Sequence, residues 1–397
     1  MSDQTTPPPL DREETAAQPS RDESPALPGQ PSLADGSTRQ RMMVGAALLT
    51  MASSVLLFCI GIITHTGQGE ASIVAASSPS PISALNPTAI PMPSATSTPA
   101  PTRTPTATPT PSPTATPTGP IYPLAVMVEN MIDARPQSGL AKADVVYEAL
   151  VEGGITRFMA VYKDGKASEI GPVRSARHYY VYMAAEFNAA YVHIGASPQG
   201  YVALDASRVT NLDETYGDPG FWRSDARYAP HNAYTSTDLL RQSLDRVREL
   251  SPGSMAGFKF GEPPKTAQGT PSRGLTIYYP GGYEVGYGYS PETKSYLRSM
   301  DGLPHRDADS GERVSPLNVV VQVIRSWTID DIGRLDMEQV GQGKALFFRD
   351  GVVSEGSWHK PSLTAPTQWL DANDTPVLMK PGKIWVQMIP PGTKMEY

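Results

Sequence analysis

The chain has 397 residues, of which 39% are hydrophobic and 40 are prolines, and its formal net charge at pH 7 is -7. This length is enough for one or two packed domains beside segments that do not pack. A mildly acidic chain of mixed charge argues against a broad nucleic-acid or anionic-lipid surface, so no nucleic-acid partner is expected. The single cysteine, Cys59, excludes an intramolecular disulfide.

The N-terminal part predicts a membrane anchor. Residues 1–41 have few large apolar side chains and no apolar period, which predicts a disordered tail. Residues 42–64, MMVGAALLTMASSVLLFCIGIIT, are uncharged and long enough to cross a bilayer as a helix. The alternative is a cleaved signal peptide, whose apolar core is usually shorter and closer to the N-terminus. Arg39 and Arg41 precede the helix, so the positive-inside rule places the tail in the cytoplasm and the rest of this single-pass protein outside.

Residues 65–120 predict a stalk. From Ser78 to Pro120 the sequence consists almost entirely of Pro, Ser, Thr and Ala, with no period that would bury a face. Such a composition favours extended polyproline conformations, with a rise of about 3.1 Å per residue. The stalk would therefore hold a folded head away from the membrane.

Residues 121–252 predict an N-terminal α/β domain. The apolar run IYPLAVMVEN, at 121–130, suits a buried strand. The run VVYEALVEGGITRFMAVYKDG, at 145–165, has two glycines between apolar segments and predicts an antiparallel hairpin. The strands of this domain are expected to form a mixed sheet with helices beside it.

The first expected helix begins at Ser175, which is placed to act as its N-cap. Tyr179, Met183 and Phe187 recur every four residues and predict a stripe that faces the core. This helix would end near Asn188.

Two further helices are expected in the same domain. A strand AAYVHIG at 189–195 leads to Ser197-Pro198, residues favoured at the N-cap and first turn of a helix. Later, Thr235 and Asp238 have the spacing of a capping box at the start of an amphipathic helix.

The C-terminal part predicts strands. Residues 253–274 are rich in Pro, Gly and Lys and are expected to be a linker, and residues 275–397 contain a series of apolar runs typical of strands. Asp350-Gly351 predicts a tight hairpin turn. No repeat of fixed period is visible, so we expect a small sheet packed against the first domain rather than a propeller or barrel. The predicted fold class is α+β, with an α/β unit followed by a mostly β unit, on a transmembrane helix and stalk.

Several runs resemble a known family. They are PLAVMVENMIDARPQSGLAKADVVYEALVEGGITRFMAVY, IGPVRSAR, RYAPHNAYTSTDLL and GKALFFRDGVVSEGSWHKPSLTAPTQWLDANDTPVLMKPGKIWVQMIP. Together they are similar to the YerB-like family of bacterial envelope proteins. The resemblance implies a two-domain extracytoplasmic module, usually tethered as a lipoprotein, and implies no established reaction. This chain departs from the family's tether, because a helix and stalk stand where a lipidated cysteine is expected.

Two clusters could bind a ligand, and the first lies in the run GPVRSARHYY. Arg174 and Arg177 lie on either side of Ser175, where guanidinium groups and helix N–H groups could converge on one anion. The alternative is that an arginine binds a loop carbonyl or a buried acid. His193 and Ser197 lie at the end of a strand and the start of the next helix, a common place for ligands. A half-buried histidine bonded to a neighbour is the alternative there.

The second cluster is the run FWRSDARYAPHN, in which aromatic and polar side chains alternate before a helix. Its candidate ligand-binding residues are Asp225, Arg227, His231 and Asn232. Aromatic rings beside polar groups suit a sugar or peptide, and a structural loop in which Asn232 bonds its own turn is the alternative. The six histidines show no HxH or HExxH spacing, so neither a metal nor another cofactor is expected.

These patterns support three hypotheses about function. The first is an accessory envelope module that binds an anionic or glycan ligand, such as cell-wall polymer. The second is a hydrolase or transferase of the same material, with His193 or His231 as general base and Arg174 and Arg177 stabilising negative charge. The third is a scaffold for another membrane protein.

Overall fold

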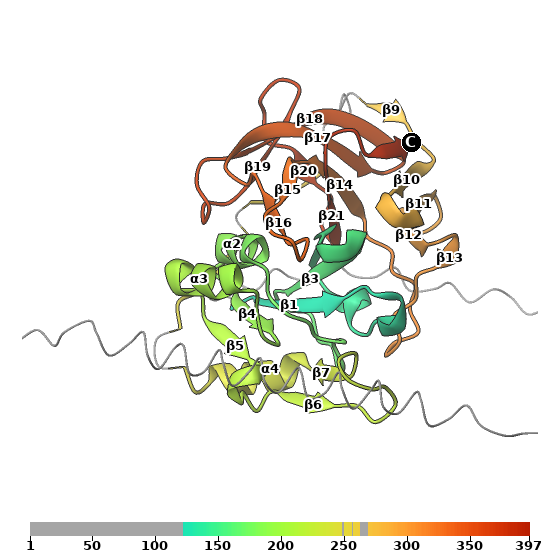
Figure 1. Ribbon diagram of the computed structural model, residues 1–397. Coiled ribbons are helices and arrows are strands. Elements are labelled where there is room, and N and C mark those ends of the chain that lie inside the picture. Colours follow the sequence, from blue (N-terminus) through green and yellow to red (C-terminus); the bar gives the residue numbers. More distant parts are fainter. Residues whose placement is uncertain (1–121, 248–249, 256, 263–268) are drawn as a thin grey trace, which may run out of the picture. The chain divides into compact units, whose positions relative to one another are not determined.

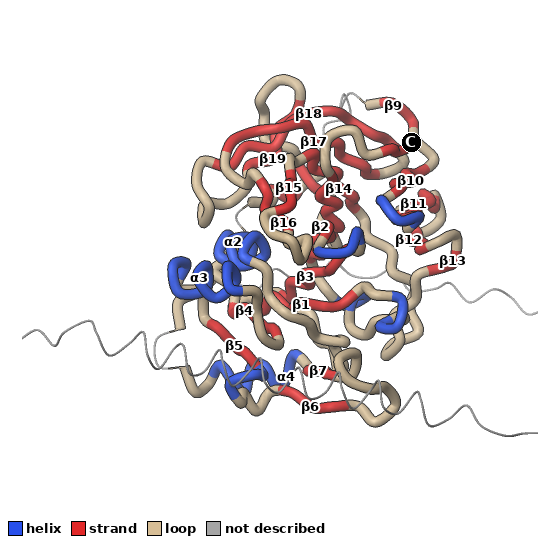
Figure 2. The backbone as a smooth tube through the Cα atoms, in the orientation of Figure 1, coloured by secondary structure: helices blue, strands red, loops and turns tan. Residues whose placement is uncertain are grey.

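The computed structural model describes residues 122–247, 250–255, 257–262 and 269–397 (Figure 1). The predicted tail, transmembrane helix and stalk lie outside these residues. Within the described ranges, no helix has the length and apolar character needed to span a membrane. Figure 2 shows that the described chain contains far more strand than α-helix and that α2 and α3 lie side by side.

The largest element is an 11-stranded mixed sheet that contains strands from both halves of the chain. Its main path runs in the order β19-β18-β17-β14-β21-β2-β3-β1-β4-β5, and β9 pairs with β18. The strands are β1 (Leu124–Glu129), β2 (Val145–Leu150), β3 (Thr156–Tyr162), β4 (Ala190–His193), β5 (Asn211–Asp213), β9 (Thr270–Pro271), β14 (Asn318–Val323), β17 (Gly341–Arg349), β18 (Val352–Lys360), β19 (Gln368–Asp371) and β21 (Ile384–Ile389).

The apolar runs of the sequence form the centre of this sheet. The predicted buried strand is β1, and the predicted hairpin is the antiparallel pair β2 and β3, with Val145 opposite Val161. Every residue of these three strands is buried. Both predictions are confirmed.

Only some of the C-terminal strands form the small sheet packed against the first that the sequence led us to expect, because β14, β17, β18, β19 and β21 join the main sheet. Within the main sheet β21 pairs in parallel with β2 on one side and with β14 on the other. All six residues of β21 are buried. Five of its six residues are apolar, and such a strand gains most from a central place with neighbours on both edges and both faces. The exception, Gln387, donates a hydrogen bond to Glu148.

A second sheet of five strands covers part of one face of the main sheet. Its order is β13-β12-β11-β10-β22. Leu275, Ile277, Val285 and Tyr287 from this sheet join Val126 of β1 in one buried cluster. The strands are β10 (Gly274–Tyr278), β11 (Glu284–Ser290), β12 (Ser295–Met300), β13 (Leu303–Pro304) and β22 (Lys394–Glu396).

The remaining strands of the described chain form short pairs, and its other elements include five single turns of 3-10 helix. The pairs are β6 (Phe221–Arg223) with β7 (Ala233–Thr235), β8 (Lys259–Phe260) with β20 (Leu378–Met379), and β15 (Ser326–Thr328) with β16 (Leu335–Met337). The 3-10 turns are η1 (Ile132–Ala134), η2 (Leu140–Lys142), η3 (Glu152–Gly154), η4 (Glu214–Tyr216) and η5 (Pro280–Gly282). Asp350 and Gly351 both have positive φ, at 49° and 74°, which confirms the predicted primed turn between β17 and β18.

Helix α2 (His178–Glu186) begins later than predicted. Ser175 does not cap it, because the segment before the helix is extended and bonded on both sides. The Arg174 N–H donates to Met127 of β1, and the Ala176 N–H donates to Gly195. The predicted core stripe is confirmed, since Tyr179, Met183 and Phe187 are all buried.

The other two helices begin close to their predicted positions. Ser197 caps α3 (Pro198–Ser207) by accepting a hydrogen bond from the Gly200 N–H, as expected. The cap of α4 (Thr237–Leu244) is Ser236 rather than Thr235. Thr235 belongs to β7, and its hydroxyl donates to the Gly220 carbonyl instead.

The parallel strands end at one edge of the main sheet. β1, β4 and β5 are parallel neighbours, and β2 runs in the same direction as β1 because both are antiparallel to β3. Helices α2 and α3 start beside this edge, where residue 176 pairs with residue 196. We call the region beyond the C-terminal ends of β1, β2, β4 and β5 the carboxyl edge. In open α/β sheets such an edge is the usual place for a ligand.

Candidate functional site

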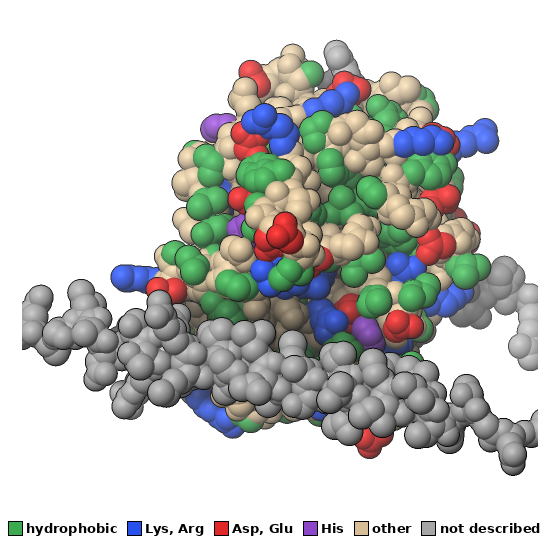
Figure 3. All heavy atoms as spheres, viewed as in Figure 1, with side chains coloured by type: hydrophobic (Ala, Val, Ile, Leu, Met, Phe, Trp, Pro, Cys, Tyr) green, Lys and Arg blue, Asp and Glu red, His purple; other side chains and the backbone are tan. Residues whose placement is uncertain are grey.

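Three acidic residues organise the polar side chains of the carboxyl edge. Glu129 ends β1, Glu152 follows β2, and Asp213 ends β5. Each lies close to at least one residue that the sequence singled out. Figure 3 shows basic side chains and a histidine gathered on this face of the molecule, over the region where Figure 1 draws β1 and β3.

Glu129 brings together residues from both predicted clusters. Its carboxylate lies 3.0 Å from Arg174 Nε through Oε1 and 2.9 Å from His231 Nδ1 through Oε2. The Glu129 side chain is only 3% exposed, whereas those of Arg174 and His231 are 25% and 11% exposed. The arginine and the histidine are therefore fixed by a buried carboxylate while each keeps a part that solvent or a ligand can reach.

The loop before β7 packs against the segment that follows β1. Arg227 donates from Nη1 to the Asp133 carbonyl and from Nη2 to the Pro136 carbonyl, at 2.6 and 3.1 Å. Asn232 Oδ1 accepts a hydrogen bond from Arg223. Asp225 lies in an exposed turn of the same loop. This loop therefore forms one wall beside Arg174 and His231.

Tyr228 adds an aromatic ring to this wall. It is 79% exposed, and its carbonyl accepts a hydrogen bond from the His231 N–H. An exposed aromatic ring beside charged groups is a surface on which a sugar ring can stack.

Arg177 is bound by a different acid. Its Nε and Nη2 atoms lie 2.5 and 2.8 Å from the two oxygens of Glu152, and its Nη1 donates to the Ala176 carbonyl. Burial raises the pKa of Glu152, but the hydrogen bond and charge of Arg177 outweigh burial and lower this pKa. Arg157, nearby on β3, donates to the Ser175 carbonyl at 2.6 Å. The guanidinium forks of Arg174 and Arg177 thus bind separate carboxylates.

His193 is completely buried at the end of β4. Its Nδ1 lies 2.9 Å from the Gly195 carbonyl and its Nε2 lies 2.7 Å from Asn211 Oδ1. Burial lowers the pKa of His193, and Asp213, 3.8 Å away, offsets this only in part. Ser197 is engaged in capping α3. In this conformation His193 and Ser197 support the edge from within, and neither side chain is open to solvent.

The sequence analysis missed the acids that hold the site. Glu129 and Asp213 end buried strands, and Glu152 follows one. A carboxylate at the end of an apolar run is a weak signal that could have suggested them, because a buried charge requires a partner. Which basic residue supplies that partner depends on the fold.

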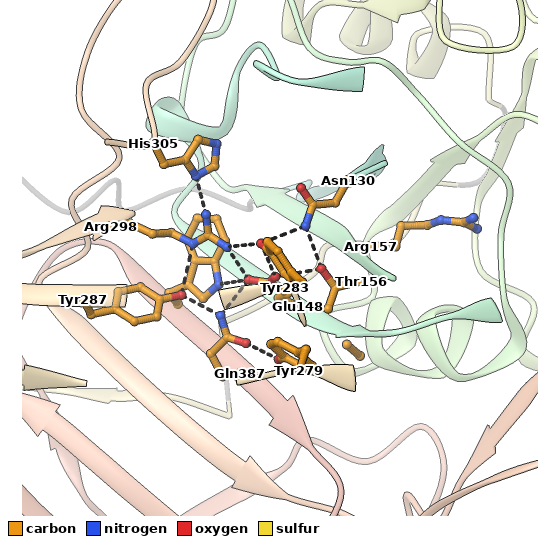
Figure 4. A network of polar contacts seen from close by, with 12 residues as sticks. Asn130, Glu148, Thr156, Arg157, Tyr279, Tyr283, Tyr287, Arg298, His305 and Gln387 are labelled. Atoms are coloured by element: carbon orange, nitrogen blue, oxygen red, sulfur yellow. Dashed lines mark hydrogen bonds and ion pairs between the residues drawn. The ribbon is translucent and has the colours of Figure 1, made fainter. Parts of the chain in front are cut away.

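A second polar network lies wholly inside the molecule and joins the two halves of the chain (Figure 4). Glu148 of β2 and Arg298 of β12 are both 0% exposed, with Glu148 Oε2 2.8 Å from Arg298 Nη2. The same carboxylate accepts hydrogen bonds from Thr156, Tyr283, Trp385 and Gln387. Neither side chain of this pair is exposed to solvent, so the network is not a ligand site in this conformation. It connects the two halves of the chain instead.

His305 completes this network. Its Nδ1 accepts a hydrogen bond from Arg298 Nη1, and its Nε2 donates to Gln137 Oε1 at 3.1 Å. Burial, and then the charge of Arg298, hold the pKa of His305 well below its usual value. The ring is therefore neutral and fixed in one tautomer.

The described part of the chain contains no group of three or more His, Cys, Asp or Glu side chains placed to hold a metal ion. The expectation that the protein needs no metal stays a prediction.

Comparisons with known proteins give consistent matches. The family described as "Protein of unknown function (DUF3048)" matches with its N-terminal domain over residues 109–249 and with its C-terminal domain over residues 275–386. A Bacillus subtilis (strain 168) protein named "Putative lipoprotein YerB" is 33% identical over 281 residues, covering 68% of this chain and 81% of that protein. The crystal structure of YerB from Bacillus subtilis superposes with a TM-score of 0.62 at 31% identity, covering 70% of this chain and 94% of that one.

Proposed function

Because this chain belongs to the DUF3048 family of YerB-like proteins, as the resemblance in its sequence predicted, we propose a function from the geometry of its carboxyl edge. The protein is a membrane-associated envelope protein whose folded part binds an anionic or glycan ligand of the envelope. The observation that carries this proposal is that Arg174 and His231 meet on the buried carboxylate of Glu129 while both stay partly exposed.

The anchor we propose is the uncharged helix at 42–64, followed by the stalk at 65–120. The relative YerB is named a lipoprotein, which supports a place at the membrane. In this chain the helix would leave the N-terminus in the cytoplasm and the folded part outside.

Protease added to intact cells should therefore degrade residues 122–397 or cut the stalk, while an epitope tag at the N-terminus stays protected until the membrane is permeabilised. Immunoblotting of the tag and sequencing of the mature N-terminus measure both. A mature chain that begins after Thr64 would show a cleaved signal instead.

The site favours an anion for electrostatic and positional reasons. The carboxylate of Glu129 balances one positive charge, and Arg174 and Arg227 both lie at this edge. Nε of Arg174 pairs with Glu129 and its Nη1 donates to the Pro230 carbonyl at 3.5 Å, so Nη2 is the part of the guanidinium that a ligand can meet most readily. Bidentate guanidinium contacts are the usual way in which proteins recognise phosphate and carboxylate. The exposed ring of Tyr228 would add a stacking surface for a sugar.

Replacing Arg174 with lysine tests this proposal. Lysine keeps the charge opposite Glu129 but loses the planar fork, so we expect at least about a tenfold weaker affinity for anionic wall polymer with little change in stability. Retention of the full chain on fractionated cell-wall polymers measures the affinity, and denaturant unfolding measures the stability. Arg325→Lys is the matched control, because Arg325 forms an exposed pair with Glu338 and contacts neither Glu129 nor His231. Equal retention of both variants would contradict the proposal.

The pairing of His231 with Glu129 also supports the second hypothesis, a hydrolase or transferase. A carboxylate bound to one ring nitrogen orients a histidine so that the other nitrogen can exchange a proton with a substrate. His231 suits this role better than His193, whose ring is completely buried with both nitrogens bonded. Release of soluble fragments from the same polymer fractions, lost in His231→Gln, would make the protein an enzyme. Binding without release would leave it an accessory module.

A further inference from the structure

One buried arginine of the carboxyl edge has no acidic partner in the described chain. Arg157 lies on β3, opposite Glu129 of β1 and Ala149 of β2, and is 6% exposed. Figure 4 shows its side chain extending away from the buried network around Glu148. Among the described residues its guanidinium makes one hydrogen bond, in which Nη1 donates to the Ser175 carbonyl at 2.6 Å.

The other buried arginine of the described chain shows what such a residue requires. Arg298 lies 2.8 Å from the carboxylate of Glu148 and forms further hydrogen bonds to two tyrosines and a histidine. Arg157 lacks such a set, and burial, followed by the charge of Arg177, lowers its pKa. A buried charge without a counter-charge costs stability, and costs of this kind are typical of binding sites, where the ligand supplies what is missing.

The acids that lie near the start of α2 and the ends of β1 and β2 are already paired. They and their partners are Glu129 with Arg174 and His231, Glu152 with Arg177, and Asp336 with His178. Arg174 and Arg177 are thus each matched by a carboxylate, whereas Arg157 is not. The complement of one unmatched guanidinium is a group with a single negative charge.

Two nitrogens of Arg157 are open to such a group. Nε and Nη2 have no hydrogen-bond partner in the described chain, and neither is among its unpartnered side-chain atoms that lack accessible surface. Both nitrogens therefore keep some accessible surface. They form one side of the planar fork that binds two oxygens of a phosphate or carboxylate, as Nε and Nη2 of Arg177 bind Glu152.

The start of α2 adds positive potential beside this fork. Ser175, whose carbonyl accepts from Arg157, lies two residues before Arg177, the N-cap of α2, and no side chain caps this helix. The N–H groups of an uncapped first turn carry partial positive charge and favour an anion nearby. Figure 3 shows further basic side chains on this face.

We propose that Arg157 is the central residue of an oxyanion subsite at the carboxyl edge, which binds a singly charged phosphodiester or carboxylate group through Nε and Nη2. This inference rests on the proposed function, because it adds a subsite to the edge where Arg174 and His231 meet. It also sets the class of the ligand. Diester-linked polymers and acidic glycans both carry such groups.

Thermal unfolding of the full chain in detergent micelles tests the subsite, with dimethyl phosphate, acetate and chloride compared at equal ionic strength. A ligand that binds only the folded chain raises its melting temperature, by about 2–4 °C at roughly ten times the dissociation constant. We expect this shift with dimethyl phosphate or acetate, and the anion with the larger shift identifies the source of the group. No shift beyond that in chloride would overturn the proposal.

Arg157→Gln removes the charge and should abolish the shift. In chloride its melting temperature should be no lower than that of the wild type, because the variant lacks an unpaired buried charge beside Arg177. Arg313→Gln is the matched control and should keep the full shift, because Arg313 also donates to a carbonyl, that of Arg298, and pairs with no acid of the described chain. A shift that persists in Arg157→Gln would overturn the proposal.

Arg157→Lys keeps the test decisive if the glutamine variant does not fold. Lysine keeps the charge but not the planar fork, so the affinity for the same anion should fall at least about tenfold. An unchanged affinity would overturn the proposal.

The subsite and the proposed function fail separately. If Arg174→Lys loses wall polymer while the Arg157 variants keep the anion shift, only the subsite is wrong. If Arg157→Gln abolishes the shift while Arg174→Lys binds the polymer as tightly as the wild type, the subsite stands and the assignment of the polymer to Arg174 is wrong.

Discussion

The free energy of unfolding of the Glu148→Gln variant should be about 3–5 kcal/mol lower than that of the wild type, and its melting temperature roughly 10 °C lower. Glutamine has nearly the same shape, but it leaves the guanidinium of Arg298 buried at 0% exposure without its counter-charge. Burial alone would lower the pKa of Arg298, and Glu148 is the first of the groups that raise it instead. Denaturant titration of the full chain measures the difference.

Two matched variants make this result specific. Glu355→Gln removes a 63% exposed acid of β18 that pairs with Lys344 of β17, so its effect should stay within about 1 kcal/mol. Adding Arg298→Met to Glu148→Gln removes the buried, unpaired guanidinium charge and should recover part of the lost stability. A loss below about 1 kcal/mol for Glu148→Gln would mean that the network in Figure 4 does not hold the two halves together.

Lys360→Met should cost about 3–5 kcal/mol near neutral pH, because it leaves Glu186 buried without its partner. Burial raises the pKa of Glu186 even beside Lys360. Without the lysine this carboxyl must either stay charged in the core or take up a proton that the unfolded chain does not hold. The variant should therefore lose stability as the pH rises above the ordinary pKa of glutamate, by up to about 1.4 kcal/mol per pH unit.

The pH dependence separates this explanation from a simple packing defect. Below the ordinary pKa of glutamate, Glu186 is protonated in both the folded and the unfolded chain, so the charge penalty disappears. The free energies of unfolding measured at pH 5 and at pH 7 should therefore differ by up to about 3 kcal/mol more in Lys360→Met than in the wild type. Lys344→Met, which removes a 48% exposed lysine on β17, is the control. A loss that does not depend on pH would contradict the ionic explanation.

Both pairs connect distant parts of the sequence. Glu148 and Arg298 are 150 residues apart, and Glu186 and Lys360 are 174 apart. The first pair connects β2 to the second sheet, and the second connects α2 to β18. Loss of either pair should therefore affect regions far from the substituted residue, which hydrogen exchange on the same variants would show.

The elements of the fold could be predicted well from the sequence. The strand at β1, the hairpin of β2 and β3, the cap at Ser197 and the turn at Asp350-Gly351 are all as expected. Each of these features depends on residues close together in the chain, through side-chain period, turn chemistry or a local hydrogen bond. The two caps predicted wrongly, at Ser175 and Thr235, failed because these residues belong to extended segments bonded to distant strands.

The candidate site shows the limit of such reasoning. The sequence singled out Arg174, Arg177 and His231 as unusual, and the first and last of these do meet. It gave no means of knowing that they meet on Glu129, which is 102 residues before His231, or that Arg177 binds Glu152. The set as a ligand site stays a prediction.

The sequence by itself determined where most strands and helices of the described chain lie and which charged residues lie among apolar ones. Only the tertiary structure decided that β21 lies between β2 and β14, and which acid neutralises which base. The physical reason is the range of each interaction. Side-chain period and turn geometry act between neighbours in the chain, whereas burial makes each charge depend on whatever partner the sheet brings within about 3 Å.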